Sequence, residues 1–129
     1  MSFSERDVSM QKVEEETNEL RRKYPLYTAI LERIPDMDLK EVVSVMVLVD
    51  GVRSLLKTHA MKLCLIGEDK EIDQMVQEKI NELKTKYASL AGVLERIHIM
   101  DLKETTIGLF GIDAMESLLK LRALVILAS

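Results

Sequence analysis

The chain has 129 residues, a size that suits one ordinary domain. Its composition, 47% hydrophobic and 31% charged with only 5 Gly and 2 Pro, is typical of a folded helical protein and argues against disorder. The formal net charge of −4 provides no positive field to hold a phosphate backbone, which disfavours a nucleic-acid-binding function. The single cysteine, Cys64, lies in an apolar run, so we expect a buried, inert thiol in a reducing, cytoplasmic protein.

The sequence repeats itself at an offset of 63 residues. Four matched segments carry the repeat: 18–24 with 81–87, 31–34 with 94–97, 37–41 with 100–104, and 54–57 with 117–120. Two copies of one unit at this period predict packing on a shared core. We therefore expect an all-α helical bundle forming a single domain, 1–129. It would contain two tandem copies, 4–66 and 69–128, of a helix–short helix–long helix unit related by pseudo-twofold symmetry.

The first helix should open at Ser4, with Asp7 completing an approximate capping box, and run to about Tyr24. Apolar positions follow a heptad-like seam with steps of three and four in both copies. The seam residues are Val13, Thr17, Leu20, Tyr24, Tyr27 and Leu31, matched by Val76, Ile80, Leu83, Tyr87, Leu90 and Leu94. This pattern predicts one buried helix face in each copy.

Pro25 in the first copy corresponds to Ala88 in the second. Proline disfavours helical geometry in the residue before it, so we expect a break near Tyr24 and a more continuous helix through Ala88. A short helix over 26–34 should then stop near Pro35, and its counterpart should end around Ile97.

The next segment begins with a capping pattern in both copies. Asp38 with Glu41, and Asp101 with Glu104, place a carboxylate at the N-cap and a glutamate three residues later. A paired-carboxylate catalytic or metal site is the alternative reading. Capping alone explains the repetition, so we favour it.

A run rich in β-branched residues, 42–49, follows the first cap and is also compatible with a buried strand. We predict a long helix reaching Ile66, because a cap precedes the run and the apolar character continues beyond it. The segment 67–70 should end this helix and link the copies. Being apolar on nearly all sides, the long helix should be the central element of each copy.

The two central helices differ in residue size at matched positions. Val45 and Leu48 align with Gly108 and Gly111. Large side chains facing small ones preserve packing density. This pattern predicts inter-repeat packing, with the two central helices crossing at these residues.

Two aspartates, Asp50 and Asp113, repeat within the most apolar stretch, and two arginines, Arg33 and Arg96, repeat as well. A buried carboxylate needs a basic partner or a raised pKa. We therefore expect structural Asp–Arg pairs, with a catalytic role as the less favoured alternative.

The final segment is apolar on more than one helical face, but its charges interrupt it too often for a transmembrane span. Surplus apolar surface marks a contact with another subunit or partner. The candidate interface consists of Leu121, Leu124, Val125 and Leu127.

No motif indicates a cofactor, and neither His59 nor His98 belongs to a metal-spaced cluster. We therefore expect a non-catalytic helical interaction module, a self-associating scaffold or accessory subunit whose partner is a protein or a second copy. Two alternatives stay open: a small helical enzyme or ligand-binding protein with a charged pocket, and a nucleic-acid-associated protein.

Overall fold

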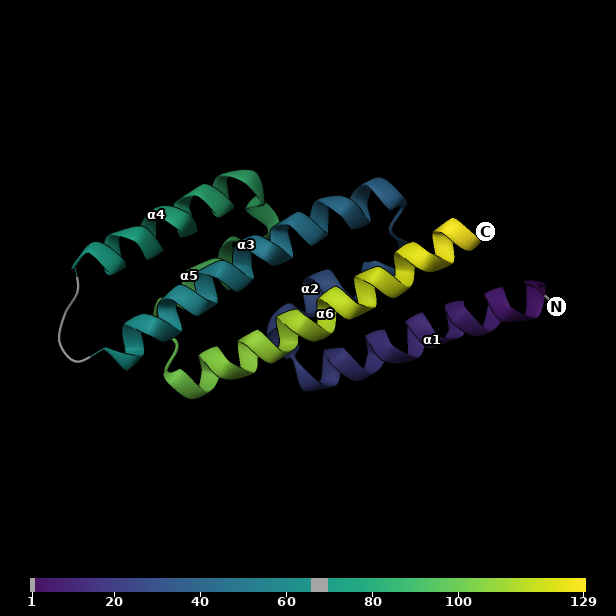
Figure 1. Cartoon of the computed structure of the whole chain (residues 1–129), viewed down its shortest axis with the longest axis horizontal. Helices are drawn as coiled ribbons and strands as arrows, with labels where there is room; N and C mark the ends of the chain where they lie inside the picture. The colour runs from purple at the N-terminus through teal and green to yellow at the C-terminus, as the bar shows by residue number, and fades with distance from the viewer. Residues whose placement is uncertain (1, 66–69) are drawn as a thin grey trace. The chain divides into compact units, whose positions relative to one another are not determined.

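The computed structural model describes residues 2–65 and 70–129; of residues 2–9 and Ser89 it describes the backbone alone. The elements in chain order are α1 (Ser2–Lys23), η1 (Pro25–Tyr27), α2 (Thr28–Leu31), η2 (Ile34–Asp36), α3 (Leu39–Cys64), α4 (Lys70–Lys86), η3 (Ala88–Leu90), α5 (Ala91–Ile97) and α6 (Leu102–Ala128) (Figure 1). Since the described part of the chain contains no strand, the predicted all-α class is confirmed, and 42–49 is helical.

Element boundaries recur at the offset found in the sequence. The helices α1 and α4 end at residues 23 and 86, and 86 − 23 = 63. The three-residue 3₁₀ helices η1 and η3 begin at 25 and 88, and the long helices α3 and α6 begin at 39 and 102, again 63 apart. Matched sequence thus forms matched local structure in both halves.

The chain divides into two compact units, and each takes segments from both halves. Unit 1 comprises Met1–Val47 and Gly111–Ser129, and unit 2 comprises Leu48–Phe110. The division therefore cuts α3 after residue 47 and α6 after residue 110, and 110 − 47 = 63. Each unit holds the first part of one long helix and the last part of the other.

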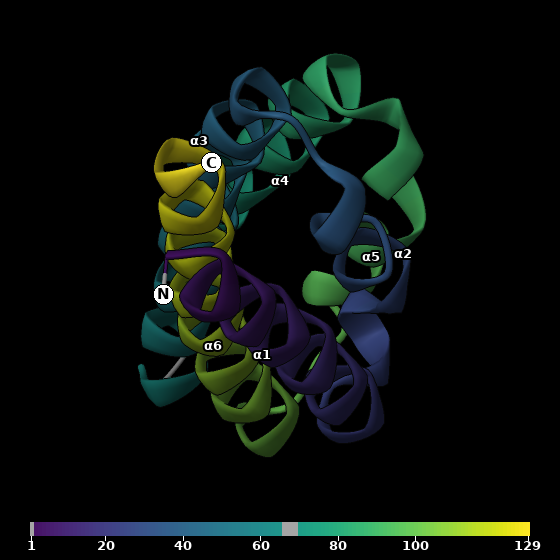
Figure 2. The same cartoon turned by 90° about the vertical axis from the view of Figure 1, so that its right-hand side faces the viewer.

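In unit 1, α1 and the C-terminal part of α6 lie side by side in both views (Figure 1 and Figure 2). Burying their apolar faces removes aliphatic surface from water, the main driving force for folding. The core consists of Val13, Tyr27, Ile30, Leu31, Ile34, Met37, Val42, Ile112, Met115, Leu118, Leu119 and Val125.

In unit 2, α4 lies along the C-terminal part of α3 (Figure 1). Gly51 of α3 permits this approach, since a Cβ built on it would lie 3.0 Å from a methyl carbon of Leu83 on α4. The core consists of Leu48, Val49, Val52, Leu55, Leu56, Val76, Ile80, Leu83, Leu90, Leu94, Ile97 and Met100. In both copies, every residue of the predicted heptad-like seam, from Val13 to Leu31 and from Val76 to Leu94, is buried or half-buried.

Predicted boundaries were wrong at Ser4, at Ala88 and over 26–34. The helix α1 begins at Ser2, so Ser4 lies inside it and is not its N-cap. The second copy breaks as the first does: Tyr87 has φ −133° and ψ 67°, against −128° and 69° at Tyr24. The break therefore does not require proline. In addition, the segment 26–34 forms η1, α2 and the start of η2 instead of one helix, with Pro35 inside η2.

Cys64 is exposed, contrary to the expected buried thiol. It is the last residue of α3, where the side chains from Leu63 to Leu65 all reach solvent. The predicted helix end at Ile66 and residues 67–69 of the predicted link lie outside the described residues. Lys70, the last residue assigned to that link, is instead the first residue of α4.

Candidate functional site

The repeated aspartates and arginines do not form buried pairs. The Asp50 side chain is 74% exposed, and its Oδ1 accepts a hydrogen bond of 2.8 Å from Nη1 of Arg53, one turn along α3. Arg33 is also exposed and donates to Glu41 at 3.3 Å. Asp113 and Arg96 lie on the surface too. The prediction was wrong because Asp50 lies on a face of α3 that meets solvent, so its carboxylate is hydrated and needs no buried partner.

Both predicted cap aspartates lie directly before a long helix. Asp38 Oδ1 accepts from the backbone N–H of Glu41 at 2.8 Å, and Asp101 Oδ1 accepts from Glu104 at the same distance. In the second copy the Glu104 carboxylate also accepts from the Asp101 N–H at 3.4 Å, the reciprocal bond of a capping box. The carboxylates serve the helix N-termini, which is a structural role.

Gly111 lies against two tyrosines of unit 1. A Cβ at this position would lie 2.7 Å from Cε2 of Tyr27 and 3.0 Å from Cδ1 of Tyr24. Tyr27 is 2% exposed, and this burial raises the pKa of its phenol. The tyrosine rings thus explain the glycine at 111. The expected crossing of the central helices at Val45, Leu48, Gly108 and Gly111 stays a prediction.

The candidate interface at the end of α6 is only partly exposed. Val125 is 5% exposed and belongs to the core of unit 1, so its assignment to an interface was wrong. Leu121 is half-buried. Leu124 and Leu127 are 64% and 69% exposed and remain available for contact. Leu121 and Val125 are four residues apart, so they lie on the same face of α6, which packs into unit 1. Leu124 and Leu127 are three residues apart and share the face that meets solvent.

Hydrogen bonds from a side chain to a main-chain oxygen, which sequence reasoning missed, link distant segments inside each unit. In unit 1, Arg122 donates from Nε and Nη2 to the main-chain oxygen of Met37, at 3.1 and 2.9 Å. In unit 2, Nε2 of His59 lies 2.9 Å from the main-chain oxygen of Met100. These residues match at the repeat offset, because 100 − 37 = 63 and 122 − 59 = 63. Each methionine carbonyl immediately precedes a cap aspartate.

The two linking side chains have different surroundings. His59 is 1% exposed, and its Nδ1 is buried without a hydrogen-bond partner among the described residues. Arg122 is half-buried, and its Nη1 donates to Sδ of Met10 at 3.1 Å. A carbonyl oxygen can only accept, so the Nε2 of His59 must carry the proton. A search of the repeat for identical residues could not find His59 and Arg122, because the two copies have different residues at this matched position.

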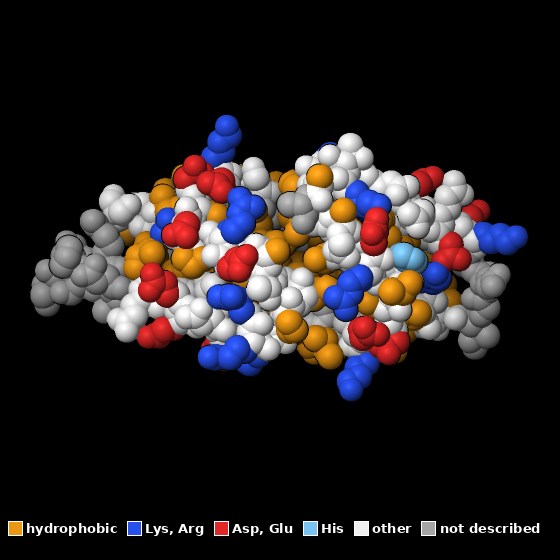
Figure 3. All heavy atoms as spheres, turned by 180° about the vertical axis from the view of Figure 1, so that it is seen from behind, with side chains coloured by type: hydrophobic (Ala, Val, Ile, Leu, Met, Phe, Trp, Pro, Cys, Tyr) orange, Lys and Arg blue, Asp and Glu red, His pale blue; other side chains and the backbone are white. Residues whose placement is uncertain are grey.

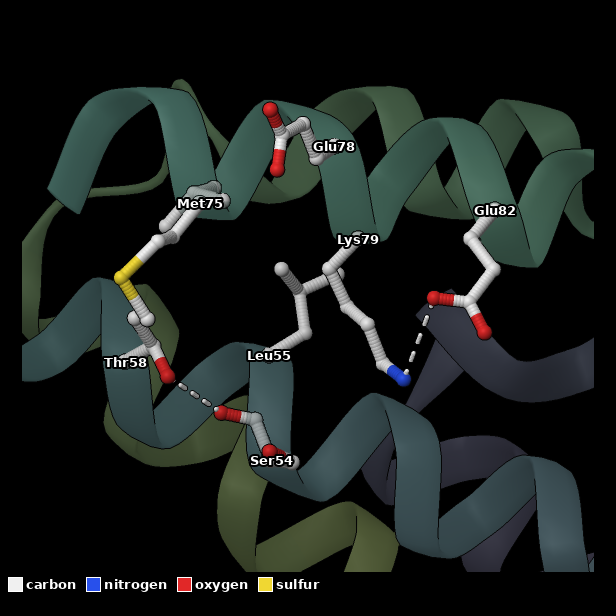
Figure 4. A pocket seen from close by; sticks show the side chains of 8 residues that line it. Ser54, Leu55, Thr58, Met75, Glu78, Lys79 and Glu82 are labelled. Atoms are coloured by element: carbon white, nitrogen blue, oxygen red, sulfur yellow. Dashed lines mark hydrogen bonds and ion pairs between the residues drawn. The ribbon is translucent and has the colours of Figure 1, made fainter. Parts of the chain in front are cut away.

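A cavity of about 300 Å³ lies between α3 and α4 of unit 2 (Figure 4). Its walls include Leu55 and Met75, and at one end Lys79 forms an ion pair with Glu82 at 3.6 Å. A hydrogen bond from Lys86, with the charges of Lys79 and Lys86, lowers the pKa of the Glu82 carboxyl. Glu82 is therefore an ionised surface carboxylate, unsuited to proton transfer near neutral pH.

Exposed hydrophobic side chains gather on the first turns of both long helices. The α3 stripe consists of Leu39, Val43 and Val47, at steps of four residues, and Val43 and Val47 are 53% and 60% exposed. The α6 stripe consists of Leu102, Ile107 and Phe110, and Phe110 is 61% exposed. Figure 3 shows one face of the molecule, where hydrophobic side chains reach the surface between charges of both signs. Stripes of this kind mark contact surfaces more often than catalytic sites.

Among the described residues, no cluster of three or more His, Cys, Asp or Glu side chains could hold a metal ion. None of the helices formed by these residues has the length and apolar character needed to cross a lipid bilayer. Comparison with protein-family models, with curated proteins and with solved structures found no match to this chain.

Proposed function

We propose that the chain is a non-catalytic helical interaction module that associates with a second copy of itself through the α3 stripe and the α6 stripe. The observation that carries the proposal is the exposure of three large hydrophobic side chains at steps of four residues on α3. Such a stripe can pair with an apolar helix face of a partner. A chain with two stripes can contact two neighbours and thus act as a scaffold.

The proposal includes two tandem copies within one domain, related by a pseudo-twofold axis. Support comes from the matched hydrogen bonds, because Arg122 of the second copy reaches Met37 of the first, and His59 of the first reaches Met100 of the second. The boundaries between the two units also support the proposal, because they cut α3 and α6 at positions 63 residues apart. In this arrangement, each copy contributes the C-terminal part of its long helix to the unit of the other.

The charged residues favour a non-catalytic role. Asp50 and Glu82 are exposed, and each is paired with a basic side chain on its own helix. Catalytic acids and bases are usually drawn into a cleft where their pKa moves toward neutrality. The exposed pairs here are typical of solvated helix surface.

The mass of the protein in solution tests the proposal. Light scattering after size exclusion, at two concentrations, should give a mass above that of one chain at the higher concentration. The double substitution V43E/V47E should abolish this gain, since each glutamate would have to lose its hydration at the contact. The control is S44E, which adds a charge to the next exposed position of α3, off the stripe.

A mass that stays at one chain across the concentration range would overturn self-association. An oligomer that survives V43E/V47E unchanged would show that another surface makes the contact. Circular dichroism of the variants must match that of the wild type, so that a loss of association is not a loss of fold.

A further inference from the structure

Unit 1 contains an apolar groove with a cation in its wall. Its volume is about 350 Å³, and Met10 of α1, Leu39 of α3, and Val125 and Ile126 of α6 supply its apolar lining. Arg122 and Asp38 supply the charged side chains, and Ser129 completes the lining. Grooves that bind small amphipathic molecules combine a mainly apolar wall with a few fixed polar groups.

The guanidinium of Arg122 is held in one orientation. Its Nε and Nη2 both donate to the carbonyl of Met37. Its Nη1 instead donates to the thioether of Met10, at 3.1 Å. A thioether is a weak acceptor, whereas a carboxylate accepts from arginine in a strong, charge-assisted bond. A carboxylate entering the groove would therefore find a donor that is already oriented and poorly satisfied.

The matched positions of unit 2 lack this combination. At the offset of 63, Met10 corresponds to Asp73, Val125 to Lys62, and Arg122 to His59. Lys62 and Asp73 form an ion pair there, and His59 is buried. The repeat alone therefore does not account for the groove, and its apolar lining around a permanent charge is specific to unit 1.

We propose that this groove binds an aliphatic monocarboxylate, with the carboxylate on Nη1 of Arg122 and the hydrocarbon chain against Leu39, Val125 and Ile126. Asp38 limits the charge that the site accepts. Its Oδ1 is occupied by the N–H of Glu41, but its negative charge remains beside the groove and opposes a second anionic group. The site is thus selective for one carboxylate on an apolar chain.

Isothermal titration of the full-length chain with octanoate tests the proposal, with octanol and acetate as matched ligands. Octanoate should bind, octanol should bind roughly tenfold more weakly for lack of the charge-assisted bond, and acetate should not bind measurably. Absence of octanoate binding, or equal affinity for octanoate and octanol, would overturn the site.

Two substitutions locate the binding. R122Q should lower octanoate affinity by roughly tenfold or more. D38N should raise it, because asparagine caps a helix as aspartate does while removing the opposing charge. D38N is informative even if R122Q fails to fold. Unchanged or lowered affinity in D38N would contradict the proposal, as would full affinity in a folded R122Q.

Discussion

His59 and Arg122 stand at matched positions of the repeat, and each makes a hydrogen bond to the main-chain carbonyl that precedes a long helix. Arg122 meets the oxygen of Met37 at 2.9 Å, and His59 meets that of Met100 at the same distance. Two different side chains thus satisfy the same kind of backbone acceptor. Because buried backbone acceptors are costly to leave unpaired, these residues should matter for folding.

Replacing Arg122 by methionine, which keeps an unbranched apolar stem, should destabilise the protein by about 1–3 kcal/mol. The cost arises because the Met37 carbonyl loses its partner. Chemical denaturation with circular dichroism measures the change.

The corresponding test in unit 2 compares H59Q with H59L. Glutamine places a donor near the position of Nε2, so H59Q should remain more stable than H59L by about 1 kcal/mol. Equal stability of the two variants would show that the bond to Met100 contributes nothing.

Gly111 cannot be enlarged without moving an aromatic ring. G111A should destabilise the protein by about 1–3 kcal/mol, since the new Cβ would lie 2.7 Å from the Tyr27 ring. The same substitution in a Y27L background, which has the leucine found at the matched position 90, should cost less, because only the Tyr24 ring, 3.0 Å from the new Cβ, would then have to move. A thermal melt of G111A identical to that of the wild type would refute the close contact.

The buried phenol of Tyr27 predicts a loss of stability in alkali. Burial raises the pKa of Tyr27 in the folded state above its ordinary value of 10.0. Stability from this group is therefore fully present below pH 10.0 and falls as the pH rises beyond it.

The variant Y27F removes this dependence and serves as the matched control. Above the ordinary pKa, the stability of the wild type should fall relative to that of Y27F by up to about 1.4 kcal/mol per pH unit. Denaturant titrations at several alkaline pH values measure the difference. Parallel curves for the two proteins would show that the phenol is not buried.

The helix caps offer a further test. D101A should destabilise the protein by about 1 kcal/mol, because the N–H of Glu104 loses its acceptor. D101N keeps an acceptor and should lose only a fraction of that amount. A D101A variant as stable as D101N would assign the cap no energetic role.

The sequence predicted those features that depend on local patterns. The helical class followed from periodicity, and the burial of Val13, Ile80 and Leu94 followed from the seam. The break at Tyr87 was missed because the prediction relied on proline, whereas the second copy makes the same break without it. A local residue preference is a weak guide where tertiary packing fixes the chain direction.

The candidate site was harder to predict. Asp50 was expected in a buried pair because its neighbours are apolar, but hydropathy does not fix which face of a long helix meets solvent. The link between Arg122 and Met37 spans 85 residues and joins side chain to backbone, so no sequence pattern indicates it. The exposed stripe of Val43 and Val47 resembled core until the structure placed it at the surface.

Methyl NMR of the wild-type chain across a dilution series tests the central claim most directly, because it reports on individual valines. We predict that the methyl signals of Val43 and Val47 shift with concentration, while those of the buried neighbours Val42 and Val49 stay fixed. Methyl shifts of Val43 and Val47 that do not change from the lowest to the highest concentration would contradict association through the α3 stripe.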